Sequence, residues 1–120
     1  MARASLIVGT ADAHSAAAST ARQALEAAAA INHRGALCEA VETLAALHAA
    51  TGEERRALVL LEVAAADRRA RTLPAARIEG ERTASLTRSL RSRLETSLAA
   101  VEAEAASTTL DEVVANRTSP

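Results

Sequence analysis

Several residue types on which many folds rely are absent or scarce. The 120-residue sequence has no phenylalanine, tyrosine, tryptophan or lysine, and only four glycines and two prolines. The lack of aromatic rings excludes recognition of single-stranded nucleic acid by base stacking. The scarcity of turn residues argues against a β-sandwich or an α/β sheet.

Cysteines and long apolar runs are also scarce. Cys38 is the single cysteine, so an internal disulfide is impossible and nothing indicates an oxidising compartment. We interpret Cys38 as a small apolar residue of a helix, with a reactive thiol as the alternative. The densest apolar stretch, residues 57–61, is far below the ~18 residues of a membrane span. Residues 6–8 are too few for a signal peptide. We therefore expect a cytoplasmic protein with no membrane partner.

The abundant residues favour helices. Alanine (33 residues), leucine (14), arginine (14) and glutamate (12) make up most of the chain, and all four are strong helix formers. The sequence therefore predicts an all-α fold, a helical hairpin or bundle with a long C-terminal helix. Leucine, isoleucine and valine together number only 24, which is a small supply for a self-sufficient core without aromatics. We therefore also expect a homo-oligomer.

Helix-start and helix-stop signals divide the chain into four segments. Stop residues follow the alanine-rich stretch, capping boxes open two later helices and a proline interrupts the pattern between them. These signals are Asn32 and Gly35, Thr51 with Glu54, Thr109 with Glu112, and Leu73 with Pro74. The predicted segments are an N-terminal tail (1–11), an alanine-rich helical pair (12–50), a long antiparallel helical hairpin (51–107) and a short helix with a tail (108–120). The second helix of the hairpin is expected over 74–107.

Helical spacing predicts which faces pack. A small-residue face that lets a partner helix approach closely consists of Ala17, Ala21, Ala24 and Ala28. The next helix carries an apolar stripe of Leu37, Val41, Leu44 and His48, in which we interpret the histidine as a satisfied core or interface residue. The predicted packing or oligomer seam of the hairpin is Leu58, Leu61, Leu86, Leu90, Leu94 and Leu98.

The net charge of −1 conceals segregated charge. Residues 1–67 carry a net charge of −3, residues 68–93 carry +6 and residues 94–120 carry −4. The basic block contains Arg68, Arg69, Arg71, Arg77, Arg82, Arg88, Arg91 and Arg93. One interpretation is an anion-binding surface for the phosphates of double-stranded DNA. The alternative is a solvated helix surface that acids of this chain or of a neighbour partly neutralise.

No arrangement of residues indicates catalysis or a metal. His33 and Cys38 are five residues apart, which is not the three- or four-residue spacing of metal ligands on one helix. Glu62 lies alone among apolar residues, and we interpret it as the ion-pair partner of an arginine; a general base is the alternative, but it has no paired group. We expect no enzyme, no metal and no cofactor.

One stretch carries a family resemblance. Residues 56–98 contain an apolar run that ends at Asp67, then Leu73 and Pro74, and then a helix with the pattern Leu-Thr-Arg-Ser-Leu-Arg-Ser-Arg-Leu, residues 86–94. This stretch resembles the helical hairpin of small terminase subunits from actinobacterial phages. The resemblance implies a ring-forming DNA-packaging adaptor in the cytoplasm of a phage-infected cell. Its partners would be double-stranded DNA and a large ATPase–nuclease subunit.

Two functional hypotheses follow from the sequence. The first is a non-enzymatic, oligomeric DNA-packaging adaptor that contacts DNA through the basic block 68–93. The second is a helical protein–protein interaction or structural module without nucleic acid, in which the arginines pair with acids. Family members often bind DNA through an N-terminal helix-turn-helix, whereas the first 67 residues of this chain are acidic overall.

Overall fold

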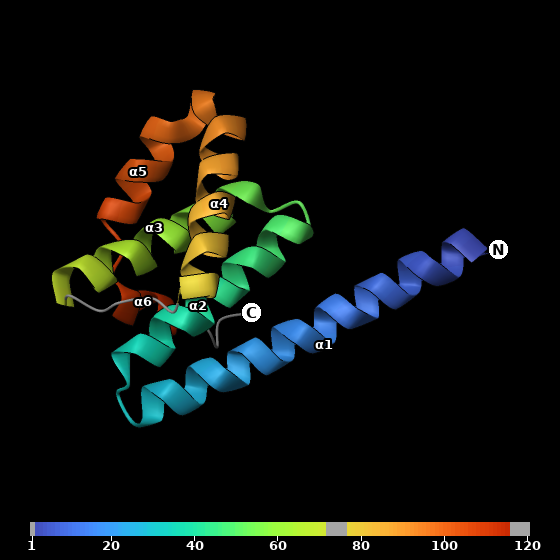
Figure 1. Cartoon of the computed structure of the whole chain (residues 1–120), viewed down its shortest axis with the longest axis horizontal. Helices are drawn as coiled ribbons and strands as arrows, with labels where there is room; N and C mark the ends of the chain where they lie inside the picture. The colour runs from blue at the N-terminus through green and yellow to red at the C-terminus, as the bar shows by residue number, and fades with distance from the viewer. Residues whose placement is uncertain (1, 72–76, 116–120) are drawn as a thin grey trace.

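The structure is a computed structural model that describes residues 2–71 and 77–115, with side chains for 16–71 and 80–115. Within these residues every element is a helix and there is no strand, which confirms the all-α part of the predicted fold (Figure 1). The helices are α1 (Ala2–Ala30), α2 (Arg34–Ala50), α3 (Glu54–Arg71), α4 (Arg77–Arg93), α5 (Leu98–Ala106) and α6 (Leu110–Ala115), with one 3-10 turn over Glu95–Ser97. The predicted break at Leu73 and Pro74 and the tail 116–120 lie outside the described residues.

The first helix is longer than predicted. The sequence pattern assigned residues 1–11 to a tail, but α1 begins at Ala2 and runs without interruption to Ala30. Gly9 is the residue of this stretch that disfavours helix most, at a cost of about 1 kcal/mol. The many alanines of α1 favour helix strongly enough to offset that cost. Residues 2–11 therefore belong to the helix and do not form the predicted tail.

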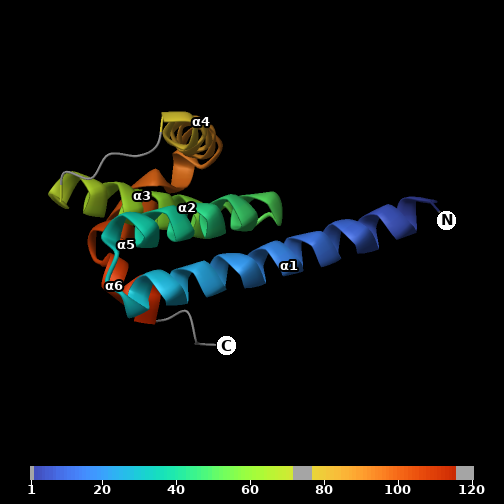
Figure 2. The same cartoon turned by 60° about the horizontal axis from the view of Figure 1, so that its bottom comes forward.

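The first three helices pack side by side and alternate in direction. Helix α2 lies between α1 and α3, along α3 and along the C-terminal half of α1 (Figure 2). Residues 51–107 do not form the predicted antiparallel hairpin. Helix α4 crosses α3 instead of running alongside it, as both views show (Figures 1 and 2). The antiparallel neighbours of the core are therefore α1 with α2 and α2 with α3.

The turn between α1 and α2 confirms one signal and shows another that the sequence did not suggest. Asn32 adopts a positive φ of 53°, the left-handed conformation that its short polar side chain tolerates. The Nδ1 atom of His33 then accepts a hydrogen bond of 3.0 Å from the backbone N–H of Ala36. His33 is therefore the N-cap of α2, a role that serine, threonine, asparagine or aspartate usually fills.

Replacing His33 with alanine is expected to lower the free energy of unfolding by about 1 kcal/mol, because the Ala36 N–H loses its acceptor. His33→Asn restores a side-chain acceptor at the same position, so it should recover most of the loss. Urea unfolding followed by circular dichroism measures both variants. Equal loss in the two variants would show that the cap hydrogen bond does not matter.

The turn between α2 and α3 corrects a predicted role. Thr51 was expected to open the third helix with Glu54, but its hydroxyl donates to the carbonyl oxygens of Leu47 and His48, each at 3.1 Å. Thr51 therefore caps the end of α2, and Gly52 with a φ of 89° makes the reversal. The predicted start of α3 is nevertheless confirmed, because its first residue is Glu54.

The predicted long helix over 74–107 is divided in two. Helix α4 ends at Arg93, a 3-10 turn follows, and α5 starts at Leu98 and runs back toward α3 (Figure 1). Leu90 and Val101 are eleven residues apart, so a straight helix would keep them on nearly the same face but about 16 Å apart along its axis. Because α4 crosses α3, such a helix would carry Val101 away from α3, whereas the break lets α5 return to α3 and both residues are buried.

Half of the leucines in the predicted seam lie in the core. Leu58, Leu61 and Leu90 are at most 2% exposed. The other three, Leu86, Leu94 and Leu98, are partly buried and pack against that core from its edge. In the described residues these leucines therefore pack within one chain. The two seam leucines of α3 are buried there and are not available for contacts with another copy.

The C-terminal helix α6 closes one end of the helical layer. The backbone N–H of Glu112 donates to the Thr109 hydroxyl at 3.1 Å, and the Glu112 carboxylate accepts from the Thr109 N–H at 3.2 Å. This is the predicted capping box. Leu110 and Val113 are buried, so this short helix is fixed by its apolar face as well as by its cap.

Candidate interaction surface

The basic block does not form one continuous surface. Four of its eight arginines, those at 68, 71, 91 and 93, form ion pairs with acids of the same chain. Three others, Arg69, Arg82 and Arg88, are exposed and form no ion pair among the described residues. The side chain of Arg77 lies outside the described residues.

Arg68 makes the most enclosed of these ion pairs. Its guanidinium donates from Nε and Nη2 to the two carboxylate oxygens of Glu42, both at 3.0 Å. The two side chains are 11% and 13% exposed, so the hydrogen bonds are largely shielded from water. They favour the charged form of Arg68 and raise its pKa. This pair joins α2 to α3 and leaves little of Arg68 for an external anion.

A second group of charges joins three helices at the end that α6 closes. Arg34 on α2 donates to Asp67 on α3 at 2.9 Å and to Asp111 on α6 at 2.7 Å. Arg71 also reaches Asp67, at 3.2 Å along the same helix. Burial alone would raise the pKa of Asp67, but hydrogen bonds and charge from Arg34 and Arg71 outweigh it and hold that pKa below its usual value.

The low pKa of Asp67 makes stability depend on pH. Because the folded-state pKa lies below the unfolded value of about 3.9, the stabilisation is present above about pH 4 and is lost as the pH falls through the folded-state pKa. We expect the difference in unfolding free energy between wild type and Asp67→Asn to shrink as the pH is lowered from about 6 to about 3. Urea unfolding at a series of pH values measures it. A difference that is constant with pH would rule out this role for Asp67.

Arg91 and Arg93 fix α4 to its neighbours. Arg91 donates to Glu62 on α3 at 2.8 Å and to Glu102 on α5 at 2.6 Å, and Arg93 reaches Glu54 at the start of α3 at 2.9 Å. The predicted arginine partner of Glu62 is thereby confirmed. Arg91 lies beside Arg69 in a depression of about 290 Å³ between α3, α4 and α5, in which two carboxylates balance the two guanidinium groups.

The remaining polar candidates are also occupied by structural contacts. His48 is not a core residue, because its side chain is 31% exposed and its Nδ1 lies 2.7 Å from the Glu53 carboxylate. The Cys38 thiol is fully buried and lies 3.7 Å from an oxygen of Asp67. Burial raises the pKa of Cys38 to about 11, against the opposing charge of Arg68. Such a thiol is a poor nucleophile, which favours the interpretation of Cys38 as a packing residue.

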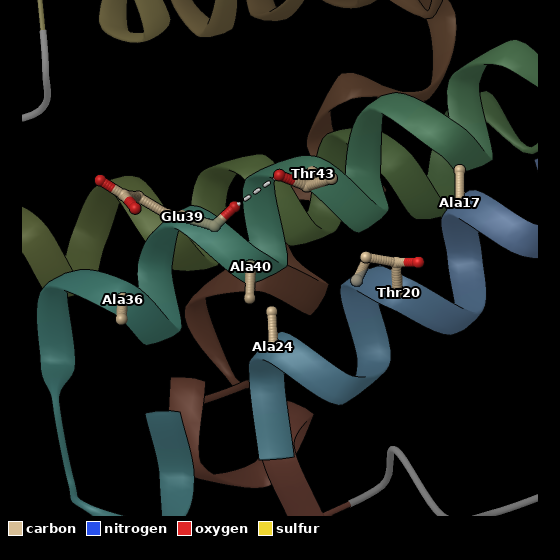
Figure 3. A pocket seen from close by; sticks show the side chains of 8 residues that line it. Ala17, Thr20, Ala24, Ala36, Glu39, Ala40 and Thr43 are labelled. Atoms are coloured by element: carbon tan, nitrogen blue, oxygen red, sulfur yellow. Dashed lines mark hydrogen bonds between the residues drawn. The ribbon is translucent and has the colours of Figure 1, made fainter. Parts of the chain in front are cut away.

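A larger open depression lies between α1 and α2. We call it the α1–α2 groove; it has a volume of about 480 Å³. It is lined by Ala17, Thr20, Ala21, Ala24, Ala36, Glu39, Ala40 and Thr43 (Figure 3). The methyl groups of Ala24 and Ala40 face each other across it, whereas the Glu39 carboxylate points away from α1. The lining of the groove is therefore mostly apolar.

The predicted small-residue face of α1 divides between two roles. Ala21 and Ala28 are buried, each 4% exposed, because α2 packs closely on them as expected. Ala17 and Ala24 remain exposed and line the groove. Periodicity could mark this face, but it could not show that a second helix would leave part of it open.

The described part of the chain contains neither a metal-binding cluster nor a membrane-spanning helix. Among the described residues, no three or more histidine, cysteine, aspartate or glutamate side chains are grouped so as to hold a metal ion. No helix in that part of the chain combines the length and apolarity needed to cross a bilayer. No protein family, curated protein or solved structure matches the chain.

Proposed function

We propose that this chain is a non-enzymatic helical protein–protein interaction module. The observation that supports it best is the internal pairing of arginines in the basic block. Arg68, Arg91 and Arg93 each bridge from one helix to another. Arginines that are ion-paired between helices of the same chain are not available for the phosphate contacts that dominate DNA affinity.

The titratable groups support a structural role in the same way. Where the pKa of a charged group departs from its ordinary value, its ion-pair partner or its burial explains the shift, as for Asp67 and Cys38. Groups with shifted pKa values in a cleft would instead point to catalysis. Together with the mostly apolar α1–α2 groove, this favours contacts with other protein surfaces.

One specific observation supports a second candidate function, that of a DNA-packaging adaptor. Arg69, Arg82 and Arg88 are exposed and have no ion-pair partner among the described residues. If they contact DNA, the large ATPase–nuclease subunit of such systems would be the further partner. Arg55 and Arg56 on α3 are exposed and equally unpaired in this part of the chain, so unpaired arginines are not confined to the basic block.

Titration with labelled double-stranded DNA distinguishes the two functions. For an interaction module, fluorescence anisotropy should show no binding tighter than about 10⁻⁴ M at physiological salt. The matched variants are Arg69→Ala/Arg82→Ala/Arg88→Ala and the control Arg55→Ala/Arg56→Ala, all at exposed positions.

The result that would overturn the proposal is specific. The wild type would bind the DNA with micromolar affinity that falls steeply with salt. The first variant set would lose this binding, whereas the control set would keep it. DNA binding unaffected by both sets would overturn the proposal as well, and would place the contact elsewhere on the chain.

A further inference from the structure

The feature that calls for a partner is the length of α1. It has 29 residues against 17 in α2, which corresponds to about 43 Å against about 25 Å. Its N-terminal half therefore runs past the end of α2 and away from the other helices (Figures 1 and 2). A helical stretch of that length is marginal in water without packing.

We propose that α1 pairs in an antiparallel manner with α1 of a second copy of this chain. The projecting half of each α1 then lies over the α1–α2 groove of the other copy. The inference rests on the proposed function and names its partner. One symmetric interface fills both grooves and covers both projecting halves.

The register of α1 supports a self-complementary pairing. Positions 6, 10, 13, 17, 20 and 24 recur at alternating steps of four and three residues along one stripe of the helix, and they are Leu6, Thr10, Ala13, Ala17, Thr20 and Ala24. None is charged. An antiparallel pair centred near residue 15 places position 6 opposite 24, 10 opposite 20 and 13 opposite 17. The one leucine position of the stripe, position 6, is therefore opposite an alanine position.

The groove can be dehydrated without leaving hydroxyl groups unsatisfied. The Thr20 hydroxyl donates to the Ala16 carbonyl at 3.0 Å, and the Thr43 hydroxyl donates to the Glu39 carbonyl at 2.9 Å. Both side chains are thus already hydrogen-bonded within their own helices. A buried hydroxyl without a partner would cost about 1–3 kcal/mol, and this groove avoids that penalty.

The wall residues also suit a helix as occupant. Alanine side chains from both α1 and α2 line the groove, and small residues let two helix backbones approach closely. The Glu39 carboxylate, the charged group among the lining residues, is turned away from α1 (Figure 3). An uncharged helix stripe therefore meets an uncharged groove.

Sedimentation equilibrium of the full chain tests the pairing. Wild type is expected to have twice the 12.4 kDa chain mass at micromolar concentration. Ala24→Arg, at an exposed groove position, should give the monomer mass with unchanged helicity by circular dichroism. Ala30→Arg, also exposed on α1 but outside the stripe, is the matched control and should remain a dimer.

A charge swap tests the register itself. Leu6→Glu alone should also give a monomer, whereas Leu6→Glu combined with Ala24→Arg should recover the dimer, because each glutamate would face an arginine of the other copy. A monomeric wild type, or a dimer unaffected by Ala24→Arg, would overturn the proposal. Failure of the double variant to recover the dimer would overturn the antiparallel register.

These outcomes are separable from those of the proposed function. A monomeric wild type that binds no DNA leaves the interaction module in place with a different protein partner. A dimer that binds DNA through Arg69, Arg82 and Arg88 overturns the proposed function but not the pairing of α1.

Discussion

Replacing Leu58 with alanine is expected to lower the free energy of unfolding by about 2–5 kcal/mol. Leu58 is 0% exposed and lies in the second turn of α3, the helix that packs against α2, α4, α5 and α6. Because small domains have total stabilities of about 5–15 kcal/mol, this one change removes a large share of the stability.

The composition explains why this loss should fall at the upper part of that range. Six of the buried core residues in the described part of the chain are alanines, and the sequence has no aromatic residue. Leucines therefore supply most of the buried side-chain volume, and no larger side chain is available to relax into the cavity that Leu58→Ala leaves.

Urea unfolding provides the measurement, and Ile31→Ala provides the control. Ile31 is 73% exposed, so its truncation should change stability by at most about 0.5 kcal/mol. If Leu58→Ala and Ile31→Ala had the same small effect, the described core would not be the one that stabilises the protein.

Arg68→Ala should cause the second-largest loss, about 2–4 kcal/mol. In the wild type the Glu42 side chain is only 13% exposed, and the substitution removes the guanidinium that donates to both of its carboxylate oxygens. Removing one partner of an enclosed ion pair is costly because the remaining charge stays poorly solvated. The neighbouring variant Arg69→Ala, at an exposed position, should be nearly neutral.

The same pair predicts the outcome of an apolar replacement. Combining Arg68→Met with Glu42→Leu removes both charges and keeps similar side-chain volumes, so stability should return close to that of wild type. A double variant that is as unstable as Arg68→Ala would show that packing, and not the unpaired carboxylate, causes the loss. Chemical unfolding at neutral pH measures all of these variants.

Local signals in the sequence predicted the helices well. The capping box of Thr109 and Glu112, the stop at Asn32 and the start of α3 are all present. Such signals succeed because they depend on residues within one helical turn. The threonine at 51 shows the limit, because its hydroxyl can cap the helix before it or the one after it.

Long-range contacts were less predictable. Arg68 and Glu42 are 26 residues apart, and charge counting alone cannot say which of 14 arginines meets which acid. The basic block is evident in sequence order, whereas its pairing depends on where α2, α4 and α5 lie around α3. The partner of Glu62 was predictable by type, since a lone carboxylate among apolar residues needs a cation.

The break between α4 and α5 was hidden for a related reason. Leucines at 86, 90, 94 and 98 fit one helix in a periodicity count, but only a bent path lets both Leu90 and Val101 reach α3. Three-dimensional packing decides where the helix stops.

The ion-paired arginines of the basic block join the helices of this fold, and the coupling free energy between Glu42 and Arg68 measures the strength of the most enclosed of these pairs. A double-mutant cycle with Glu42→Ala, Arg68→Ala and both substitutions, measured by urea unfolding, isolates that energy. We expect about 2 kcal/mol, well above the roughly 0.2–1 kcal/mol of solvent-exposed pairs. Additive effects of the two substitutions, to within about 0.5 kcal/mol, would show that this ion pair does not stabilise the contact between α2 and α3.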